Sequence, residues 1–262
     1  MWIPAPVKRV LKPLLREYPH PLLDREEELG PRDRQLEAAY ERAIEGFFLQ
    51  TDESFVRARY REACRERRVV EALAGERLDA RPTLDVGSGN GAFELAMGVR
   101  GRVAIGVEPL WNPPFLRVAR ETGMPVRRVV ADASRLPFRD GTFGAVTCFD
   151  ALEHFRDAAA IGSEAVRVAS PDGLIFVTTP SRLRYLFRRD PHYGIRGLVL
   201  LPSKWQQRLV RRRGFGELYH TERIYGSVPS IARLFPGARV HAVVSRWKVM
   251  RRWLWDFVVL EK

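Results

Sequence analysis

The sequence lacks the features of a disulfide scaffold, a cysteine-rich zinc site or a membrane span. Its only cysteines, Cys64 and Cys148, are far apart and have no metal-ligand spacing. They fit a reducing compartment, and we therefore expect a cytoplasmic protein. No window approaches about 18 uninterrupted apolar residues, so no transmembrane helix is expected. The first residues also lack the apolar core of a signal peptide.

Lysine is scarce as well, and arginine supplies most of a formal net charge of +12. The charge is unevenly distributed along the chain. Residues 1–179 carry 26 basic and 27 acidic side chains, whereas residues 180–262 carry 18 basic and 5 acidic ones. A positive excess confined to the last third favours an anionic partner, such as a phosphorylated small molecule, a nucleic acid or an acidic membrane surface.

The most informative segment is Leu-Asp-Val-Gly-Ser-Gly-Asn-Gly at residues 84–91. The apolar run over 82–86 predicts a buried strand, and residues 92–97 predict a helix. Glycines at alternate positions let the chain turn sharply and let a ligand lie against bare backbone. No Gly-Lys-Ser/Thr follows, so the loop is not a P-loop, and the G-x-G-x-G spacing disfavours a dinucleotide site. The carboxylate of Asp85 repels a pyrophosphate but suits an ammonium group or a ribose hydroxyl.

Acidic residues also end the next two predicted strands. The run over 103–107 ends in Glu108, and the run over 126–131 ends in Asp132 and Ala133. Ligands of open α/β sheets bind at the carboxyl ends of the strands, where these side chains are expected to meet. Glu108 suits ribose hydroxyls, Asp132 suits the amine of an adenine, and the Ala133 N–H suits a ring nitrogen. Each acid taken alone is equally consistent with a solvated loop residue.

Taken in order, these segments resemble the glycine motif and the following acidic strand motifs of class I S-adenosylmethionine-dependent methyltransferases. The resemblance spans about residues 82–180 and is nearest to the small-molecule branch that includes the ubiquinone-biosynthesis O-methyltransferases. Gly144 departs from the pattern, since that branch usually has an acid there. The resemblance implies S-adenosylmethionine as cofactor. The residues expected to bind it are Asp85, Gly87, Ser88, Gly89, Gly91, Glu108, Asp132, Ala133 and Phe149.

Strands that alternate with helical patterns from about residue 82 onward predict an α/β fold with a parallel sheet. The resemblance implies that this sheet is Rossmann-like, seven-stranded and mostly parallel, with helices on both faces and an antiparallel C-terminal strand. A helical N-terminal extension is also expected. Residues 1–80 are interpreted as an arm and helices covering the cleft, with helical stripes over 32–49 and 53–74. Residues 81–262 are interpreted as the methyltransferase domain. An insertion over 181–226 is too long for a plain connection and is expected on the substrate side.

The segment after the fourth strand, Phe149 to His154, lies where an acceptor should approach. His154 is a candidate general base because the pKa of an unperturbed imidazole lies near neutral pH, and Asp150 is a second catalytic candidate. Asp150, Glu153 and His154 also resemble an acid-x-x-Glu-His run that some relatives link to a divalent metal, if the segment is helical. Acids on a helix surface are more common without a metal, so no metal is expected.

The insertion supplies the candidate substrate residues Arg188, Arg189, His192 and Tyr193, which could bind a phosphate or carboxylate. The leading hypothesis is methyl transfer to an O or N atom of a small or lipid-linked, anionic acceptor. Two alternatives remain open. One is an RNA methyltransferase that uses the basic C-terminal third, and the other is a non-catalytic cofactor-binding or membrane-surface scaffold. Tryptophans among basic residues at 247–253 also allow a peripheral membrane contact.

Overall fold

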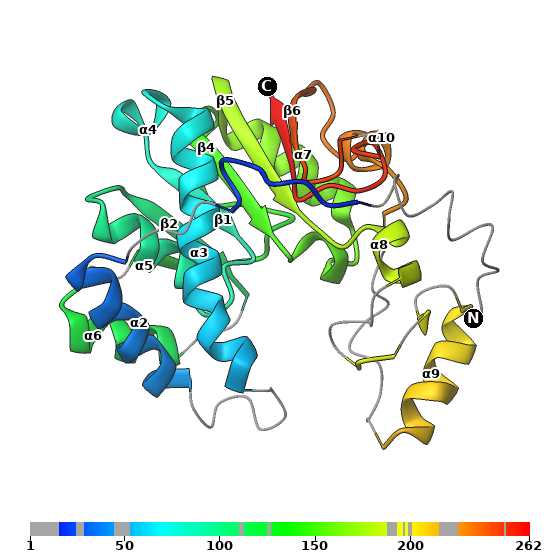
Figure 1. Cartoon of the computed structure of the whole chain (residues 1–262). Helices are drawn as coiled ribbons and strands as arrows, with labels where there is room; N and C mark the ends of the chain where they lie inside the picture. Colours follow the sequence, from blue (N-terminus) through cyan, green and yellow to red (C-terminus); the bar gives the residue numbers. More distant parts are fainter. Residues whose placement is uncertain are drawn as a thin grey trace.

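The computed structural model describes residues 16–24, 29–44, 53–109, 113–124, 127–187, 193–195, 197–198, 201–214, 225–248 and 250–262. A central sheet carries helices on both faces (Figure 1). Its strands are β1 (Thr83–Val86), β2 (Ala104–Glu108), β3 (Arg128–Val130), β4 (Phe143–Phe149), β5 (Ala169–Thr178), β6 (Arg239–Val244) and β7 (Phe257–Glu261). The helices are α2 (Pro31–Ile44), α3 (Glu53–Ala74), α4 (Arg77–Ala80), α5 (Ala92–Val99), α6 (Pro113–Thr122), η1 (Leu152–His154), α7 (Ala158–Val168), α8 (Arg182–Phe187), α9 (Ser203–Arg212) and α10 (Val228–Ala232).

The strand order is β3-β2-β1-β4-β5-β7-β6, and β1 to β5 are parallel. Only β7 runs antiparallel to its neighbours, β5 and β6. The register pairs Asp85 of β1 with Gly106 of β2 and Thr147 of β4. This topology confirms the predicted seven-stranded, mostly parallel sheet with an antiparallel C-terminal strand. It also brings the carboxyl ends of β1, β2 and β4 to one edge.

Side chains of β4 alternate between two hydrophobic cores. Ala145 and Phe149 face a core built with α2, α3 and α5, whereas Val146 and Cys148 face a core built with α7 and α10. All seven residues of β4 are buried, as expected for a central strand covered on both faces. The alternation makes the sheet the middle of three layers.

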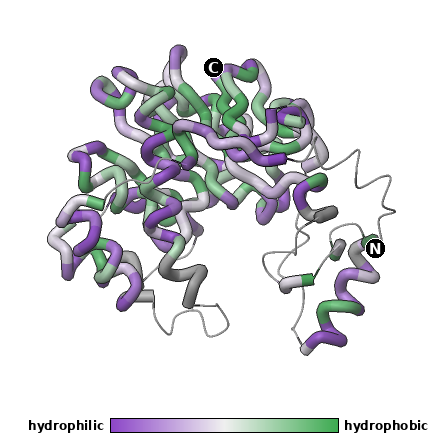
Figure 2. Tube along the Cα trace, viewed as in Figure 1, coloured by the Kyte–Doolittle hydropathy of each residue, from purple (hydrophilic) through white to green (hydrophobic). Residues whose placement is uncertain are grey.

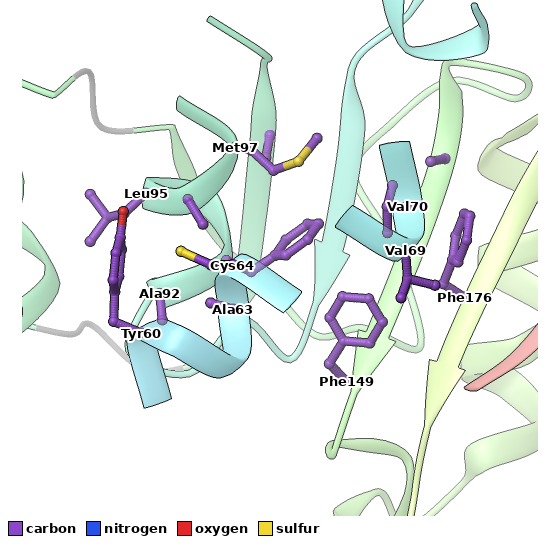
Figure 3. Close-up of a cluster of buried hydrophobic side chains, with 14 of the residues drawn as sticks. Tyr60, Ala63, Cys64, Val69, Val70, Ala92, Leu95, Met97, Phe149 and Phe176 are labelled. Atoms are coloured by element: carbon purple, nitrogen blue, oxygen red, sulfur yellow. The ribbon is translucent and has the colours of Figure 1, made fainter. Parts of the chain in front are cut away.

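Helix α3 covers the sheet beside the glycine loop (Figure 3). Tyr60 and Cys64 lie against α5, and Val69 lies near Phe149 of β4 in that view. The helix ends at Ala74, and Gly75 follows with a φ of +51°, a conformation that glycine adopts without strain. The predicted helix over 53–74 thus has these bounds in the structure.

The last strand is shorter than predicted. The mostly apolar run over 253–260 predicts a strand of that length from the sequence alone, but β7 begins only at Phe257. Trp255 explains the difference, because its side chain is buried and its indole N–H donates to the carbonyl oxygen of Thr179 at 3.2 Å. This contact holds the residues before Phe257 out of the ladder.

Among the residues described above, no helix is both long and apolar enough to cross a membrane. The described part of the N-terminal arm instead lies on the turn between β6 and β7. There the Tyr18 N–H donates to the Arg246 carbonyl oxygen at 2.9 Å, and the Arg246 Nε donates to Asp24 at 2.9 Å.

Candidate active site

The glycine loop joins β1 to α5 at the carboxyl edge of the sheet. Gly87, Gly89 and Gly91 have φ angles of +74°, +49° and +75°. These left-handed conformations strain any residue with a Cβ, so the alternating glycines are required by the turn itself. At Gly87 space is also lacking, since a Cβ there would lie 2.6 Å from the Cβ of Ala151.

The Gly89 peptide is held on both sides by charged side chains. Its N–H donates to Oε2 of Glu108 at 3.0 Å, and its carbonyl oxygen accepts from Nη2 of Arg128 at 2.8 Å. The same Arg128 nitrogen donates to Oγ of Ser88 at 2.9 Å and lies 3.5 Å from Glu94. Glu108 therefore contacts the loop directly. Arg128 binds the loop as well and is paired with Glu94; the sequence analysis identified neither residue.

Asp85 lies at the end of β1, almost fully buried at 4% exposure. Burial and the nearby charge of Glu94 raise the pKa of the Asp85 carboxyl well above its usual value, although the hydrogen bond from Thr147 opposes the shift. The Thr147 hydroxyl donates to Oδ1 of Asp85 at 2.6 Å. A carboxyl held in this way is poised to ionise when a cation arrives.

A second group of carboxylates lies close to Asp85. Oxygen atoms of Glu62, Glu66 and Asp150 lie within 4.8 Å of one another, and Arg59 donates to Glu66 at 3.0 Å. Glu66 is 1% exposed, and its Oε2 has no hydrogen-bond partner. Burial raises the pKa of Glu66 to about 7, against the lowering effect of Arg59. This end of the site therefore gathers carboxylates, with one guanidinium beside them, and suits a cationic group.

Sequence reasoning missed Arg59, Glu62 and Glu66, because nothing in α3 resembles a motif. A signal was nevertheless available. Glu66 stands at helical spacing from Ala63 and Val70, so a carboxylate occupies the buried stripe of the helix. Such a residue is rarely buried without a reason.

The residues expected to contact adenine lie past the end of β3. Asp132 is exposed and accepts hydrogen bonds from the Ser134 N–H and hydroxyl, both at 2.8 Å, which lower the pKa of its carboxyl. Ala133 is buried against the second core. The register pairs Glu108 of β2 with Val130 of β3. Asp132, two residues after Val130, therefore lies at the same carboxyl edge of the sheet as Glu108.

The segment after β4 is not helical in the way the metal alternative required. The helix η1 is a single 3-10 turn over three residues, so Asp150, Glu153 and His154 do not share a helical face. Glu153 is buried and accepts from the Thr179 hydroxyl at 2.9 Å, whereas His154 is exposed. Among the described residues, the carboxylates that cluster with Asp150 come from α3 instead.

Two predicted residues next to this segment differ in placement. Asp150 has a φ of +46°, the only positive φ of a non-glycine residue in the described ranges, and its N–H donates to Oγ1 of Thr178 at 2.9 Å. Phe149 is buried, and its ring packs edge-to-face on Phe93 and Phe257. The Phe149 side chain therefore belongs to the core, and its role toward a cofactor stays a prediction.

Most of the predicted substrate residues cannot be placed. Arg188, Arg189 and His192 lie outside the described residues. Tyr193 is half-buried and packs on a small apolar cluster that includes Ile195 and Leu198.

Comparison with known proteins places residues 84–177 in a family described as a methyltransferase domain. The chain is 35% identical over 126 residues to a ubiquinone biosynthesis O-methyltransferase of Dechloromonas aromatica, covering 44% of this chain and 50% of that protein. It is 37% identical over 94 residues to an uncharacterized methyltransferase of a Mycobacterium species, covering 36% of each. The match thus spans about half or less of these relatives.

Solved structures agree on the fold. The PH0226 protein of Pyrococcus horikoshii superposes with a TM-score of 0.55 at 18% identity, over 82% of this chain and 92% of that one. A putative sarcosine dimethylglycine methyltransferase from Galdieria sulphuraria gives a TM-score of 0.54 at 14% identity, over 89% and 98% of the two chains. At these identities the likeness is one of architecture.

Proposed function

We propose that the chain methylates an oxygen or nitrogen atom of a small or lipid-linked, anionic acceptor. The premise is that residues 84–177 form a methyltransferase domain of the class I S-adenosylmethionine-dependent type, related to the ubiquinone O-methyltransferases. The observation that carries the proposal is the arrangement around Gly89. A glycine turn in left-handed conformations lies between Asp85 and Glu108, two carboxylates from neighbouring parallel strands.

The residues present fit the cofactor. A buried carboxyl oxygen of Glu66 without a partner, the raised pKa of Asp85 and the three-carboxylate group all favour a cationic ligand at one end of the loop. S-adenosylmethionine is such a ligand, and it supplies a methyl group activated by a sulfonium. Asp85 and Glu66 would hold its ammonium group, and Arg59 would hold its carboxylate.

The other end of the loop suits a nucleoside. Glu108 would accept from ribose hydroxyls, and Asp132 would accept from the adenine amine. The glycine backbone leaves room for the ligand to lie against main chain. These assignments follow the acids along the sheet edge from β1 to β3.

For the chemical step, the chain has to align the acceptor and remove its proton. We assign the role of proton acceptor to the imidazole of His154, an exposed residue of the segment after β4. Asp150 lies four positions earlier in the sequence, and hydrogen bonds with Thr178 hold both its N–H and its carboxylate. Asp150 would then position the acceptor or the imidazolium formed after proton transfer.

The distribution of positive charge supports an anionic acceptor. Arg182 and Arg184 lie at the start of the insertion, shortly after β5, and the whole positive excess of the chain lies in residues 180–262. Cations there would hold a phosphate or carboxylate of the acceptor away from the acids of α3. A lipid-linked acceptor meets the same requirement if its headgroup is anionic.

Isothermal titration with S-adenosylmethionine and its demethylated product tests the proposal. We expect micromolar to millimolar dissociation constants for the wild type, and no binding for Asp85→Lys or Gly89→Trp. Transfer of a labelled methyl group to an extract of small molecules and lipids would then identify the acceptor. A folded wild-type protein that binds neither compound would refute the cofactor assignment.

A further inference from the structure

The insertion leaves the sheet and returns to it at one point. Ser181 and Tyr225 form a parallel bridge, and the Arg182 N–H donates to the Tyr225 carbonyl oxygen at 2.9 Å. Ser181 follows the carboxyl end of β5, the edge at which the glycine loop also lies. The excursion between these two residues therefore starts beside the candidate active site, and the helix α9 is part of it (Figure 1).

Helix α9 has one face against protein and one face without a cover in the described structure. Val210 is buried and Leu209 half-buried, and they pack with Ile195 and Leu198. One strongly hydrophobic stretch of the helix lies between hydrophilic stretches (Figure 2). The exposed side chains of the helix include Lys204, Trp205, Arg208, Arg211 and Arg212.

Two apolar side chains stand among these cations. Trp205 is 59% exposed, more than any other large hydrophobic side chain of the described residues, and Leu201 just before the helix is 38% exposed. The guanidinium of Arg208 lies 5.5 Å from the centre of the Trp205 ring. Leu201 and Trp205 lie four positions apart in the sequence, and both expose apolar surface at the start of α9.

The charge of this surface has one sign. No Asp or Glu occurs in residues 191–216, whereas that stretch holds Lys204 and several arginines. This charge favours an anionic partner. A nucleic acid would also offer phosphates for the cations and bases for the indole. Basic side chains together with an exposed tryptophan and leucine are, however, the composition of helices that lie in the interface of an anionic membrane.

We propose that α9, through Leu201, Trp205 and its exposed basic residues, docks the protein on an anionic lipid bilayer. In the headgroup layer the two apolar side chains enter the acyl boundary, and the arginines extend to the lipid phosphates. The proposal does not depend on methyl transfer, since these residues belong to neither the loop nor the carboxylate group. If the proposed function also holds, docking brings the active-site edge toward lipid-linked acceptors.

Sedimentation with sucrose-loaded vesicles tests this proposal. We expect the wild-type protein to sediment with vesicles of equal parts phosphatidylcholine and phosphatidylglycerol and to remain in the supernatant with phosphatidylcholine alone. The double variant Arg208→Glu/Arg212→Glu should bind the anionic vesicles at least about 25-fold more weakly, because each basic residue near such a surface contributes about fivefold. Trp205→Ala should weaken binding several-fold without changing the net charge.

The matched control is Arg117→Glu/Arg120→Glu on α6, which makes the same charge change at two exposed positions. It should sediment like the wild type, and thermal unfolding should show that all variants fold. Equal loss in the control, or equal binding to both vesicle types, would overturn the proposal. So would tighter binding of single-stranded RNA than of anionic vesicles at the same ionic strength, which would assign the surface to nucleic acid.

Discussion

The guanidinium of Arg128 donates to the carbonyl oxygen of Gly89 at 2.8 Å, from a side chain that is only 2% exposed. The side chain extends from β3 past β2 to the loop, and it also forms an ion pair with Glu94 of α5. Gly106 of β2 makes the approach possible, since a Cβ there would collide with the Glu94 carboxylate and the Ser88 hydroxyl. The shape of the cofactor loop thus depends on an ion pair beneath it.

Replacing Arg128 separates stability from ligand affinity. Arg128→Met leaves the buried Glu94 without its cation and should cost about 3 kcal/mol of unfolding free energy. It also frees the Gly89 peptide, so affinity for S-adenosylmethionine should fall about tenfold or more. The double variant Arg128→Met/Glu94→Gln removes the uncompensated charge and should recover stability but not affinity.

Urea unfolding and isothermal titration give the two quantities, and Arg127→Met on the exposed neighbour is the control. If affinity recovers together with stability in the double variant, Arg128 acts only through folding and does not position the loop.

Gly87 is limited by space as well as by its backbone angle. Gly87→Ala should lower the free energy of unfolding by at least about 2 kcal/mol and abolish cofactor binding, because the new Cβ would lie 2.6 Å from the Cβ of Ala151. Gly75→Ala has a similar positive φ but open space around it, so it should cost only about 1 kcal/mol and leave binding unchanged.

The double variant Gly87→Ala/Ala151→Gly tests the cause. Removing the Ala151 Cβ should restore part of the lost stability in thermal unfolding, with the strain of the φ angle left over. No recovery would mean that backbone strain alone, and not the contact with Ala151, accounts for the loss.

Stability should decrease with rising pH because of Glu66. Burial raises its pKa from 4.5 in the unfolded chain to about 7 in the folded protein. Glu66 is neutral in both states below pH 4.5, and between pH 4.5 and 7 only the unfolded chain gives up the proton, so the folded state is penalised progressively. The full penalty is roughly 3 kcal/mol above the folded pKa.

The variant Glu66→Gln carries no titrating group at this position. The unfolding free energy of the wild type relative to the variant should therefore fall by roughly 3 kcal/mol between about pH 4.5 and about pH 7.5. Chemical unfolding across this range measures it, and Glu76→Gln at an exposed position of the surface is the control. A wild-type curve parallel to that of Glu66→Gln would contradict the buried, ionising carboxyl.

The sheet and the glycine edge were predictable because each depends on local pattern. A short apolar run, a glycine turn and an acid at the strand end are all contiguous in sequence, and β1 and β2 lie within a residue of the predicted runs. The antiparallel C-terminal strand followed from the resemblance to a family. Trp255 shows the limit, since an apolar, β-favouring residue left the ladder to bond with Thr179, a partner 76 positions away.

The electrostatic part of the site depends on contacts that no local pattern encodes. Glu66 lies near Asp150 only because α3 packs over the sheet. Arg128 has the sequence pattern of an ordinary polar strand residue, and its role depends on the space that Gly106 of the neighbouring strand β2 leaves for the Glu94 carboxylate. Charged residues within apolar stripes mark such positions, but the sequence does not say which partner each will have.

The role of His154 can be decided by the rate of methyl transfer, once an acceptor is identified. A general base takes the proton of the acceptor as the methyl group moves, so His154→Ala should lower kcat about a hundredfold, because the proton must then pass to water. Affinity for S-adenosylmethionine should change little, since the loop and its acids are intact. Arg156→Ala, at another exposed position of the same segment, should retain the wild-type kcat. A His154→Ala enzyme with the wild-type kcat would remove the histidine from the mechanism and leave proton transfer to Asp150, whose replacement by Asn should then lower kcat instead.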